Sequence, residues 1–240
     1  MIRLARLLVT FNTPILLVLA NTLIVMTPLW LAAAYNRPGF PPDSYGFSRS
    51  ERIELATRVT NWLGSDEGLV ALSNLRLPDG QEMFNGRELR HLWDVKLLAG
   101  QAYRLAILAL ALFAAGFEIC RRNCALHVAL QRGAQLTLIL LIAIVVLAVA
   151  SWDQAFTEFH RLLFASGTCY FAYSDTLIRL FPEQFWFDAL LFLAGLTAAQ
   201  ALALNLLANP SPPRWKTLRH LLYWRRRDSG ASNLEQAKRP

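Results

Sequence analysis

The chain has 240 residues, of which 55% are hydrophobic and only 17% are charged. Soluble domains carry about 25% charged residues, and the deficit here lies in long stretches with almost no charge, which is the mark of membrane spans. These stretches leave no room for a large soluble domain, and the net charge of +7 comes from basic residues that flank them.

Four stretches are apolar enough and long enough to cross a bilayer as helices, which takes about 20 residues each. They comprise residues 11–34, 101–119, 134–151 and 185–208. Pro14 and Pro28 lie in the first stretch, and each is expected to bend the helix or to mark its end. A cleaved signal peptide is the alternative for this stretch, but its apolar part exceeds the roughly 7–15 residues of a signal peptide. The sequence therefore favours a membrane protein with four transmembrane helices.

Basic residues orient these spans, because Lys and Arg accumulate in cytoplasmic flanks. More than half of the 24 Lys and Arg residues lie in residues 1–10, in the loop 120–133 and in the tail 209–240. They are Arg3, Arg6, Arg121, Arg122, Arg132, Arg214, Lys216, Arg219, Arg225, Arg226, Arg227, Lys238 and Arg239. Both termini are therefore predicted to be cytoplasmic in a plasma membrane. The basic charge indicates topology rather than a nucleic-acid partner.

The first outer segment, residues 35–100, opens with prolines that favour an extended, turning path. Ser48 and Glu51 form a capping-box pattern that begins a helix, and Gly64 is a typical stop. The stripe that this helix is expected to bury consists of Ile53, Ala56, Val59 and Leu63.

A hairpin-like element is expected next. Residues 69–77 alternate loosely, Pro78-Asp79-Gly80 is a turn signal, and residues 81–84 are placed to form a return strand. Asn85 and Glu88 then resemble a second cap, which opens a helix leading into the second span. The first outer segment is therefore predicted to be a small α+β unit.

The second outer segment, residues 152–184, begins with Trp152-Asp153 at the membrane surface. Phe156, His160 and Phe164 recur at intervals of four and so share one face of a helix. The apolar run 175–182 is interrupted by Asp175 and Arg179, which predicts a short interfacial or re-entrant element before the fourth span.

Histidine is the commonest general acid or base, and the chain has four. His127 and His220 fall among cytoplasmic arginines, whereas His91 and His160 both fall in outer segments near the membrane boundary. A histidine that only hydrogen-bonds within its own helix is the plainer interpretation of each alone. Two on the same side of the membrane favour chemistry there.

Other enzyme classes lack their signatures in this sequence. It contains no G-x-S-x-G, no H-E-x-x-H and no glycine-rich phosphate loop, which argues against a serine hydrolase, a zinc peptidase and a nucleotide-dependent enzyme. The spans hold almost no charge, which argues against an ion-coupled transporter.

Several separate motifs, in order between about residues 30 and 188, resemble the bacterial lipoprotein intramolecular transacylase (Lit) family. They are Tyr35-Asn36-Arg37-Pro38-Gly39-Phe40-Pro41, Tyr45-Gly46-Phe47-Ser48, Phe84-Asn85, Glu88-Leu89-Arg90-His91, Asp94-Val95-Lys96, Phe159-His160 and Asp175-Thr176-Leu177-Ile178-Arg179-Leu180-Phe181-Pro182. The resemblance implies a bacterial plasma-membrane enzyme whose substrates are lipoproteins with a diacylglyceryl group on the N-terminal cysteine. It implies transfer of the sn-2 acyl chain to the cysteine α-amino group, giving the lyso-form lipoprotein, with no cofactor and no metal.

The resemblance also implies that His91 and His160 carry the chemistry. We expect His160 to act as the base at the amine and His91, oriented by Asp94, to serve the oxyanion or the leaving oxygen, although the two roles are interchangeable at this stage. The supporting residues are expected to be Asp94, Lys96, Arg37, Arg179 and Asp175. The residues expected to contact substrate are Tyr35, Asn36, Tyr45, Phe156 and Phe164.

Three alternatives remain open from the sequence. The first is a non-enzymatic membrane scaffold or assembly factor. The second is a metal-dependent membrane hydrolase that uses the two histidines with Asp94 or Glu158. The third is an intermolecular acyltransferase with a phospholipid donor.

Overall fold

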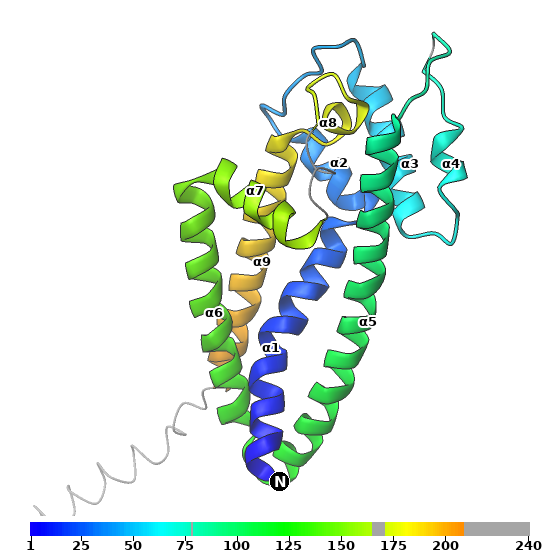
Figure 1. The fold of residues 1–240 in the computed structure, drawn as a ribbon. Helices are drawn as coiled ribbons and strands as arrows, with labels where there is room; N and C mark the ends of the chain where they lie inside the picture. The colour runs from blue at the N-terminus through cyan, green and yellow to red at the C-terminus, as the bar shows by residue number, and fades with distance from the viewer. Residues whose placement is uncertain (78, 165–170, 209–240) are drawn as a thin grey trace, which may run out of the picture.

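The structure is a computed structural model that describes residues 1–77, 79–164 and 171–208. Within these ranges the chain is helical and contains no sheet. Four long helices form a bundle, and shorter helices form a head at one end of it (Figure 1). The predicted basic tail 209–240 and Pro78 of the predicted turn lie outside the described residues.

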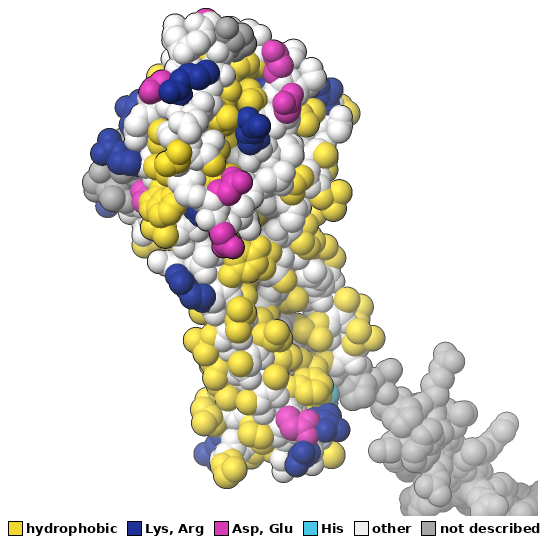
Figure 2. All heavy atoms as spheres, turned by 90° about the vertical axis from the view of Figure 1, so that its right-hand side faces the viewer, with side chains coloured by type: hydrophobic (Ala, Val, Ile, Leu, Met, Phe, Trp, Pro, Cys, Tyr) yellow, Lys and Arg dark blue, Asp and Glu magenta, His cyan; other side chains and the backbone are white. Residues whose placement is uncertain are grey.

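The bundle consists of α1 (Ile2–Val25), α5 (Gly86–Arg122), α6 (Leu126–Ala150) and α9 (Glu183–Ala208). Each of the four is long and apolar enough to cross a membrane, which agrees with the four predicted spans. Figure 2 shows apolar side chains covering the bundle on one face, with charged side chains on the head and at the opposite end. The four helices thus give an integral membrane protein.

Helix α5 is longer than a bilayer requires. Its 37 residues extend over about 55 Å, whereas the hydrocarbon core is about 30 Å thick. Five charged residues lie in its first turns, up to Lys96, whereas residues 97–117 carry only Arg104 and the helix ends with Glu118, Arg121 and Arg122. The first turns of α5 therefore belong to the head, and its long apolar stretch belongs to the membrane.

The first predicted span, residues 11–34, is divided between two helices. Helix α1 begins earlier, at Ile2, and ends at Val25, and α2 (Pro28–Asn36) follows as part of the head. Thr27 is extended and Pro28 is the first residue of α2, a position that suits proline because no backbone N–H is needed there. Pro28 therefore marks an end, whereas Pro14 lies inside α1.

Helix α1 packs closely against its neighbours because two glycines leave space for it. A Cβ atom on Gly116 of α5 would lie 2.9 Å from the carbonyl oxygen of Ala5. A Cβ atom on Gly133 of α6 would lie 2.6 Å from Oγ1 of Thr13. Small residues at helix contacts let backbones approach, which is how helices associate in lipid.

The head packs α2, α3 (Arg49–Leu63), α4 (Val70–Ser73) and α8 (Thr176–Leu180) against the first turns of α5 and α9. Both predicted capping boxes form, with Ser48 and Glu51 at α3 and with Asn85 and Glu88 at α5. The buried apolar side chains of the head are Trp30, Leu31, Ala34, Tyr35, Ala56, Val59, Trp62, Leu72, Met83, Phe84, Leu92, Leu177, Leu180, Phe181, Phe185 and Ala189.

The predicted hairpin of the head is wrong in its first strand. Val70–Ser73 form the short helix α4, and in the described residues pairing is limited to an antiparallel bridge between Arg76 and Glu82. Gly80 adopts a φ of 85° at the turn, a conformation that glycine tolerates. The weak alternation of residues 69–77 was insufficient to specify a strand, because helix and strand share such short apolar runs.

Helix α7 (Trp152–Leu163) runs across the bundle beneath the head rather than along it (Figure 1). It follows α6 directly at Ser151 and carries the predicted face with Phe156 and His160. Phe159 and Leu162 are exposed on it, as expected for a helix that lies in the interfacial plane of a membrane.

We predict that Gly133→Ala destabilises the bundle, because the new methyl group would overlap the Thr13 side chain and push α1 and α6 apart. Overpacking of this kind costs about 1–3 kcal/mol. The measurement is the thermal unfolding midpoint of the purified protein in detergent. Gly195→Ala is the matched control, because a Cβ atom there meets nothing within 4 Å. An equal midpoint for both variants would contradict the close packing.

Candidate active site

His91 and His160 come together from different helices, although 69 residues separate them in the sequence. His91 lies on the head portion of α5 and is 7% exposed, and His160 lies in the last turn of α7. Their rings are stacked, with centroids 6.0 Å apart and an interplanar angle of 23°. The pair is thus formed where the head meets the bundle.

Phenylalanine rings enclose this pair. Phe164 lies 4.8 Å from the His91 ring and 5.6 Å from the His160 ring, measured between centroids. Phe156 lies 4.1 Å from His160, and Phe171 meets His91 edge-on at 5.2 Å. The two predicted substrate-contacting phenylalanines, Phe156 and Phe164, therefore do adjoin the histidines.

The geometry fixes the tautomer of His160. Its Nδ1 lies 2.7 Å from the carbonyl oxygen of Phe156. A carbonyl oxygen only accepts hydrogen bonds, so Nδ1 carries a proton and donates it. In the neutral ring Nε2 is then the unprotonated nitrogen, which is the one able to take up a proton.

Burial keeps both imidazoles neutral. Desolvation, together with a smaller effect of the nearby His160, lowers the pKa of His91 to about 4. Desolvation also lowers the pKa of His160, and its hydrogen bond to Phe156 offsets part of that effect. At neutral pH the site therefore holds a pair of uncharged rings, one a candidate base and the other a candidate hydrogen-bond donor.

Two predicted supporting residues on α5 have other surroundings. In the described residues no hydrogen bond or ion pair joins Asp94 to His91, so its predicted orienting role has no contact behind it. Lys96 donates to the carbonyl oxygen of Trp62 at 2.5 Å and lies over the Trp62 ring. Lys96 lies five residues after His91 and therefore on another face of the helix, and its hydrogen bond joins α5 to the end of α3.

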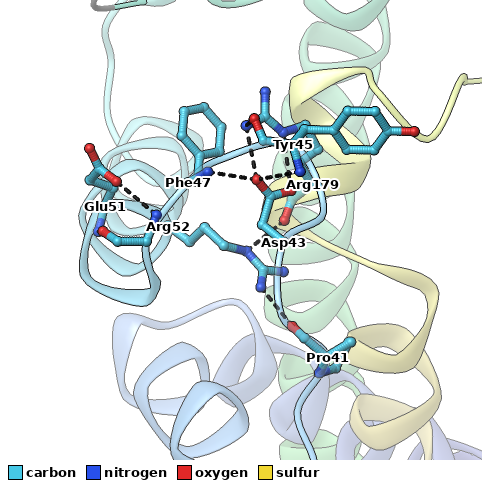
Figure 3. A network of polar contacts seen from close by, with 8 residues as sticks. Pro41, Asp43, Tyr45, Phe47, Glu51, Arg52 and Arg179 are labelled. Carbon is cyan, nitrogen blue, oxygen red and sulfur yellow. Dashed lines mark hydrogen bonds and ion pairs between the residues drawn. The ribbon is translucent and has the colours of Figure 1, made fainter.

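Arg179 is enclosed in a network around the loop 41–47 (Figure 3). It binds Asp43 through Nη2 at 2.9 Å and Nε at 3.1 Å, and both side chains are nearly buried. Burial would raise the pKa of Asp43, but the hydrogen bonds from Arg179 and from the Phe47 backbone outweigh it and lower that pKa. Arg52 donates to the carbonyl oxygens of Arg179 and Pro41. The Arg179 charge is thus neutralised within the head.

The remaining polar candidates also make contacts within the protein. Tyr35 is fully buried and donates to the carbonyl oxygen of Leu180 at 2.5 Å, so it belongs to the core instead of contacting substrate directly. Asn36 accepts from Arg49, and Arg37 pairs with Asp188 at 2.7 Å. Tyr45 is half-exposed and lies beside Arg179.

Two residues near His91 were missed as site residues by the sequence patterns. Glu88 was identified only as a cap, but it is 2% exposed and accepts from the backbone N–H of Leu177 at 2.7 Å. Phe171, which contacts His91, has no distinguishing sequence signal. Glu88 does have a sequence signal, because it lies three residues before His91 and therefore shares its helical face. Within the described ranges no three His, Cys, Asp or Glu side chains converge as a metal-ligand set.

The chain was compared with known proteins. Residues 7–186 match the model of the family described as lipoprotein intramolecular transacylase Lit. An uncharacterized protein of Aquifex aeolicus (strain VF5) is 32% identical over 163 residues, which cover 68% of this chain and 74% of that protein.

Solved structures share the fold. The in meso structure of the membrane integral lipoprotein intramolecular transacylase Lit from Bacillus cereus superposes with a TM-score of 0.73, covering 94% of this chain and 98% of that one at 20% identity. A structure of the same protein with a histidine-to-arginine substitution gives a TM-score of 0.71, with 95% of both chains covered at 20% identity. The bundle and the head together therefore form a known membrane fold.

We predict that Asp43→Ala destabilises the head strongly, because it leaves the Arg179 guanidinium nearly buried without its carboxylate. Breaking a buried ion pair in this way costs about 3–5 kcal/mol. Glu158→Ala is the matched control, since it removes the exposed partner of Arg161 and should cost about 0–1 kcal/mol. Thermal unfolding in detergent measures both, and a similar small effect for the two variants would show that Arg179 does not depend on Asp43.

Proposed function

The chain belongs to the lipoprotein intramolecular transacylase family, and on that premise we propose that His91 and His160 transfer an acyl chain within a lipoprotein substrate at the outer face of the membrane. The acyl chain moves from the sn-2 oxygen of the S-diacylglyceryl group to the α-amino group of the N-terminal cysteine of the lipoprotein. The observation that carries this proposal is the stacked pair of neutral histidines in an aromatic enclosure where the head meets the bundle.

Ester-to-amide transfer is downhill, so it needs no external energy source. The amine is tethered to the ester that it attacks, which supplies a high effective concentration. The enzyme has to expose the amine lone pair, since an α-amino group with a pKa near ~8 is largely protonated at neutral pH. It also has to stabilise the oxyanion and return a proton to the glycerol oxygen.

His160 fits the role of base. The α-ammonium group first loses a proton to solvent, and the free amine that results is the nucleophile. Nε2 of His160 then takes a proton from this nitrogen as it attacks the ester carbonyl carbon and the tetrahedral intermediate forms. The imidazolium that results is stabilised by the hydrogen bond from Nδ1 to Phe156, by the Phe156 ring and by the C-terminal end of α7. When the C–O bond to glycerol breaks, that proton passes to the leaving oxygen, so that one N–H is exchanged for one O–H.

His91 fits the role of a neutral donor. With a pKa of about 4 it is not protonated at neutral pH, so it is poorly suited to act as a pre-charged acid. A neutral imidazole N–H still donates a hydrogen bond to an oxyanion. Because His91 stays uncharged, the imidazolium that forms on His160 meets no like charge 6.0 Å away.

The proposed topology follows from charge. Arg3 and Arg6 lie at the start of α1, and Arg121 and Arg122 end α5, all at the end of the bundle opposite the head (Figure 1). The positive-inside rule assigns this end to the cytoplasm, which puts the head and the histidines outside. Diacylglyceryl-modified lipoproteins, anchored in the outer leaflet, are then the substrates within reach.

We predict that His160→Ala and His91→Ala each lower transacylation by ~10²–10⁴-fold, because each removes a proton-transfer or donor group. The chain is expressed in a bacterium that makes diacylated lipoproteins, and the N-terminal lipopeptide of one lipoprotein is fragmented by mass spectrometry. One acyl group on the amine and one on glycerol marks the wild-type product.

His127→Ala is the control for that experiment, because this histidine is exposed on α6. All variants are checked for membrane insertion. Wild-type product from either active-site variant would refute the mechanism. Loss of product on adding a chelator would favour a metal-dependent reaction, and an acyl group drawn from labelled phospholipid would favour intermolecular transfer.

We also predict that kcat, once divided by the fraction of substrate present as free amine, stays constant as the pH falls through 6.5, the ordinary pKa of histidine. Burial lowers both pKa values, so the neutral base persists to lower pH than a solvated histidine would allow. The acid limb of this corrected kcat should therefore lie below 6.5, measured with saturating diacylglyceryl lipopeptide in detergent. A corrected kcat that is half-maximal at or above 6.5 would mean that a solvated group is the base.

A further inference from the structure

A cluster of polar contacts joins the first turn of α5, one turn before His91, to the start of α8. We call it the latch, and it consists of Asn85, Arg87, Glu88, Asp175 and the backbone N–H of Leu177. It closes the chain segment 171–177 onto the helix that carries His91.

Glu88 is the buried centre of the latch. Oε1 accepts the backbone N–H of Leu177 in α8 at 2.7 Å, and Oε2 accepts the backbone N–H of Asn85 at 2.7 Å. The residue is 2% exposed. A buried carboxylate is costly unless its oxygens are satisfied, and here the two helix starts satisfy them.

Asp175 provides the outer half of the latch. It accepts from Asn85 at 3.2 Å and from Arg87 at 3.0 Å, and it also accepts the backbone N–H of Ala172 at 2.9 Å. The Arg87 guanidinium lies over the Phe171 ring, 5.6 Å from its centroid. The segment that begins with Phe171 is therefore held at both of its ends.

The latch sets the position of Phe171, and Phe171 forms one wall of the histidine site. Its ring meets His91 edge-on with centroids 5.2 Å apart, while His160 of α7 and Phe164, the residue after α7, pack against the same imidazole. Among the described residues, the titratable or charged groups near His91 include His160 on α7, Arg87 and Glu88 one turn earlier and Asp94 one turn later on α5, and Asp175 at the start of α8. The polar contacts of the latch therefore hold the residue that forms this wall in place.

We propose that Glu88 is a positioning residue for the transacylation: its carboxylate docks α8 on α5 and thereby holds Phe171 against His91. This inference rests on the proposed function of the histidine pair. Glu88 acts through the segment 171–177 and has no contact with substrate in this scheme. Its effect is to keep water from His91 and to keep the ring in one place.

The test compares Glu88→Ala and Glu88→Gln with the wild type and with Glu54→Ala, an exposed carboxylate on α3 that serves as the matched control. Alanine removes both acceptors, and glutamine retains one. We expect kcat with a diacylglyceryl lipopeptide to fall by up to ~10²-fold for alanine, a typical effect of a misplaced site, and by less for glutamine. The KM of the two Glu88 variants should hardly change, and neither should the activity of Glu54→Ala.

The second readout is the His91 pKa, from NMR of histidine-labelled full-length protein in detergent, with the His91 signal identified by its absence in His91→Ala. Water that reaches a loosened site should move this pKa from about 4 toward 6.5 in Glu88→Ala, with an intermediate value in Glu88→Gln. Phe171→Ala should give the same shift, and adding Glu88→Ala to it should add little, because both act through one contact.

A fall in kcat with an unchanged His91 pKa would overturn the inference, since it would reduce Glu88 to a general stability residue. Unchanged kcat and pKa would overturn it as well. If Glu88→Ala does not fold, Glu88→Gln decides by the same two criteria. The pKa readout does not require activity, so the two proposals can fail separately. If the His91 pKa rises in Glu88→Ala but His91→Ala is fully active, the proposed function is refuted, while the structural link between Glu88 and the His91 site stands.

Discussion

The docking of α8 is the constraint on which the head and the histidine site depend. A helix of five residues satisfies almost none of its own backbone groups, and Leu177 and Leu180 bury it in the head core. Side chains from three other elements satisfy those groups: Glu88 accepts from Leu177, Arg52 donates to the carbonyl oxygen of Arg179, and Tyr35 donates to that of Leu180. Removing these partners would leave buried polar groups unpaired, so α2, α3, α5 and α8 hold together as one unit.

The same docking determines the environment of the histidines. Glu88 accepts the backbone N–H of Leu177 in α8 and lies one turn before His91. The residue that docks α8 and the imidazole of the site therefore belong to one helix. Helix α7 brings His160 from the other side, and its own carbonyl fixes the tautomer. Two charged side chains of the head are paired away from the rings, Arg179 with Asp43 and Lys96 with the Trp62 carbonyl. The rings packed against the pair are phenylalanines, and desolvation lowers both histidine pKa values.

Local sequence patterns predicted what local physics decides. The four spans, the caps at Ser48 and Asn85 and the shared face of Phe156 and His160 all follow from spacing and residue type, and all are present. Two charged candidates, Lys96 and Arg179, are bound elsewhere in the head by partners distant in sequence: Lys96 meets a carbonyl 34 residues away, and Arg179 a carboxylate 136 residues away. Local sequence patterns do not predict such a pairing. The contact between Phe171 and His91 could not be predicted for the same reason, because only the fold brings the two residues together.

A neutral histidine pair suits a reaction in which both partners arrive on one substrate. The tether already overcomes the entropy of bringing amine and ester together, so the protein gains most from controlling where one proton goes. Two charged imidazoles would repel each other strongly in an aromatic site of low dielectric, and two solvated ones would admit water that competes with the amine for the ester. In the proposed reaction, burial keeps both rings uncharged at rest, and the hydrogen bond from His160 to Phe156 leaves Nε2 as the proton acceptor of that ring. The charge that appears during transfer then resides on the one ring whose helix end and backbone acceptor stabilise it.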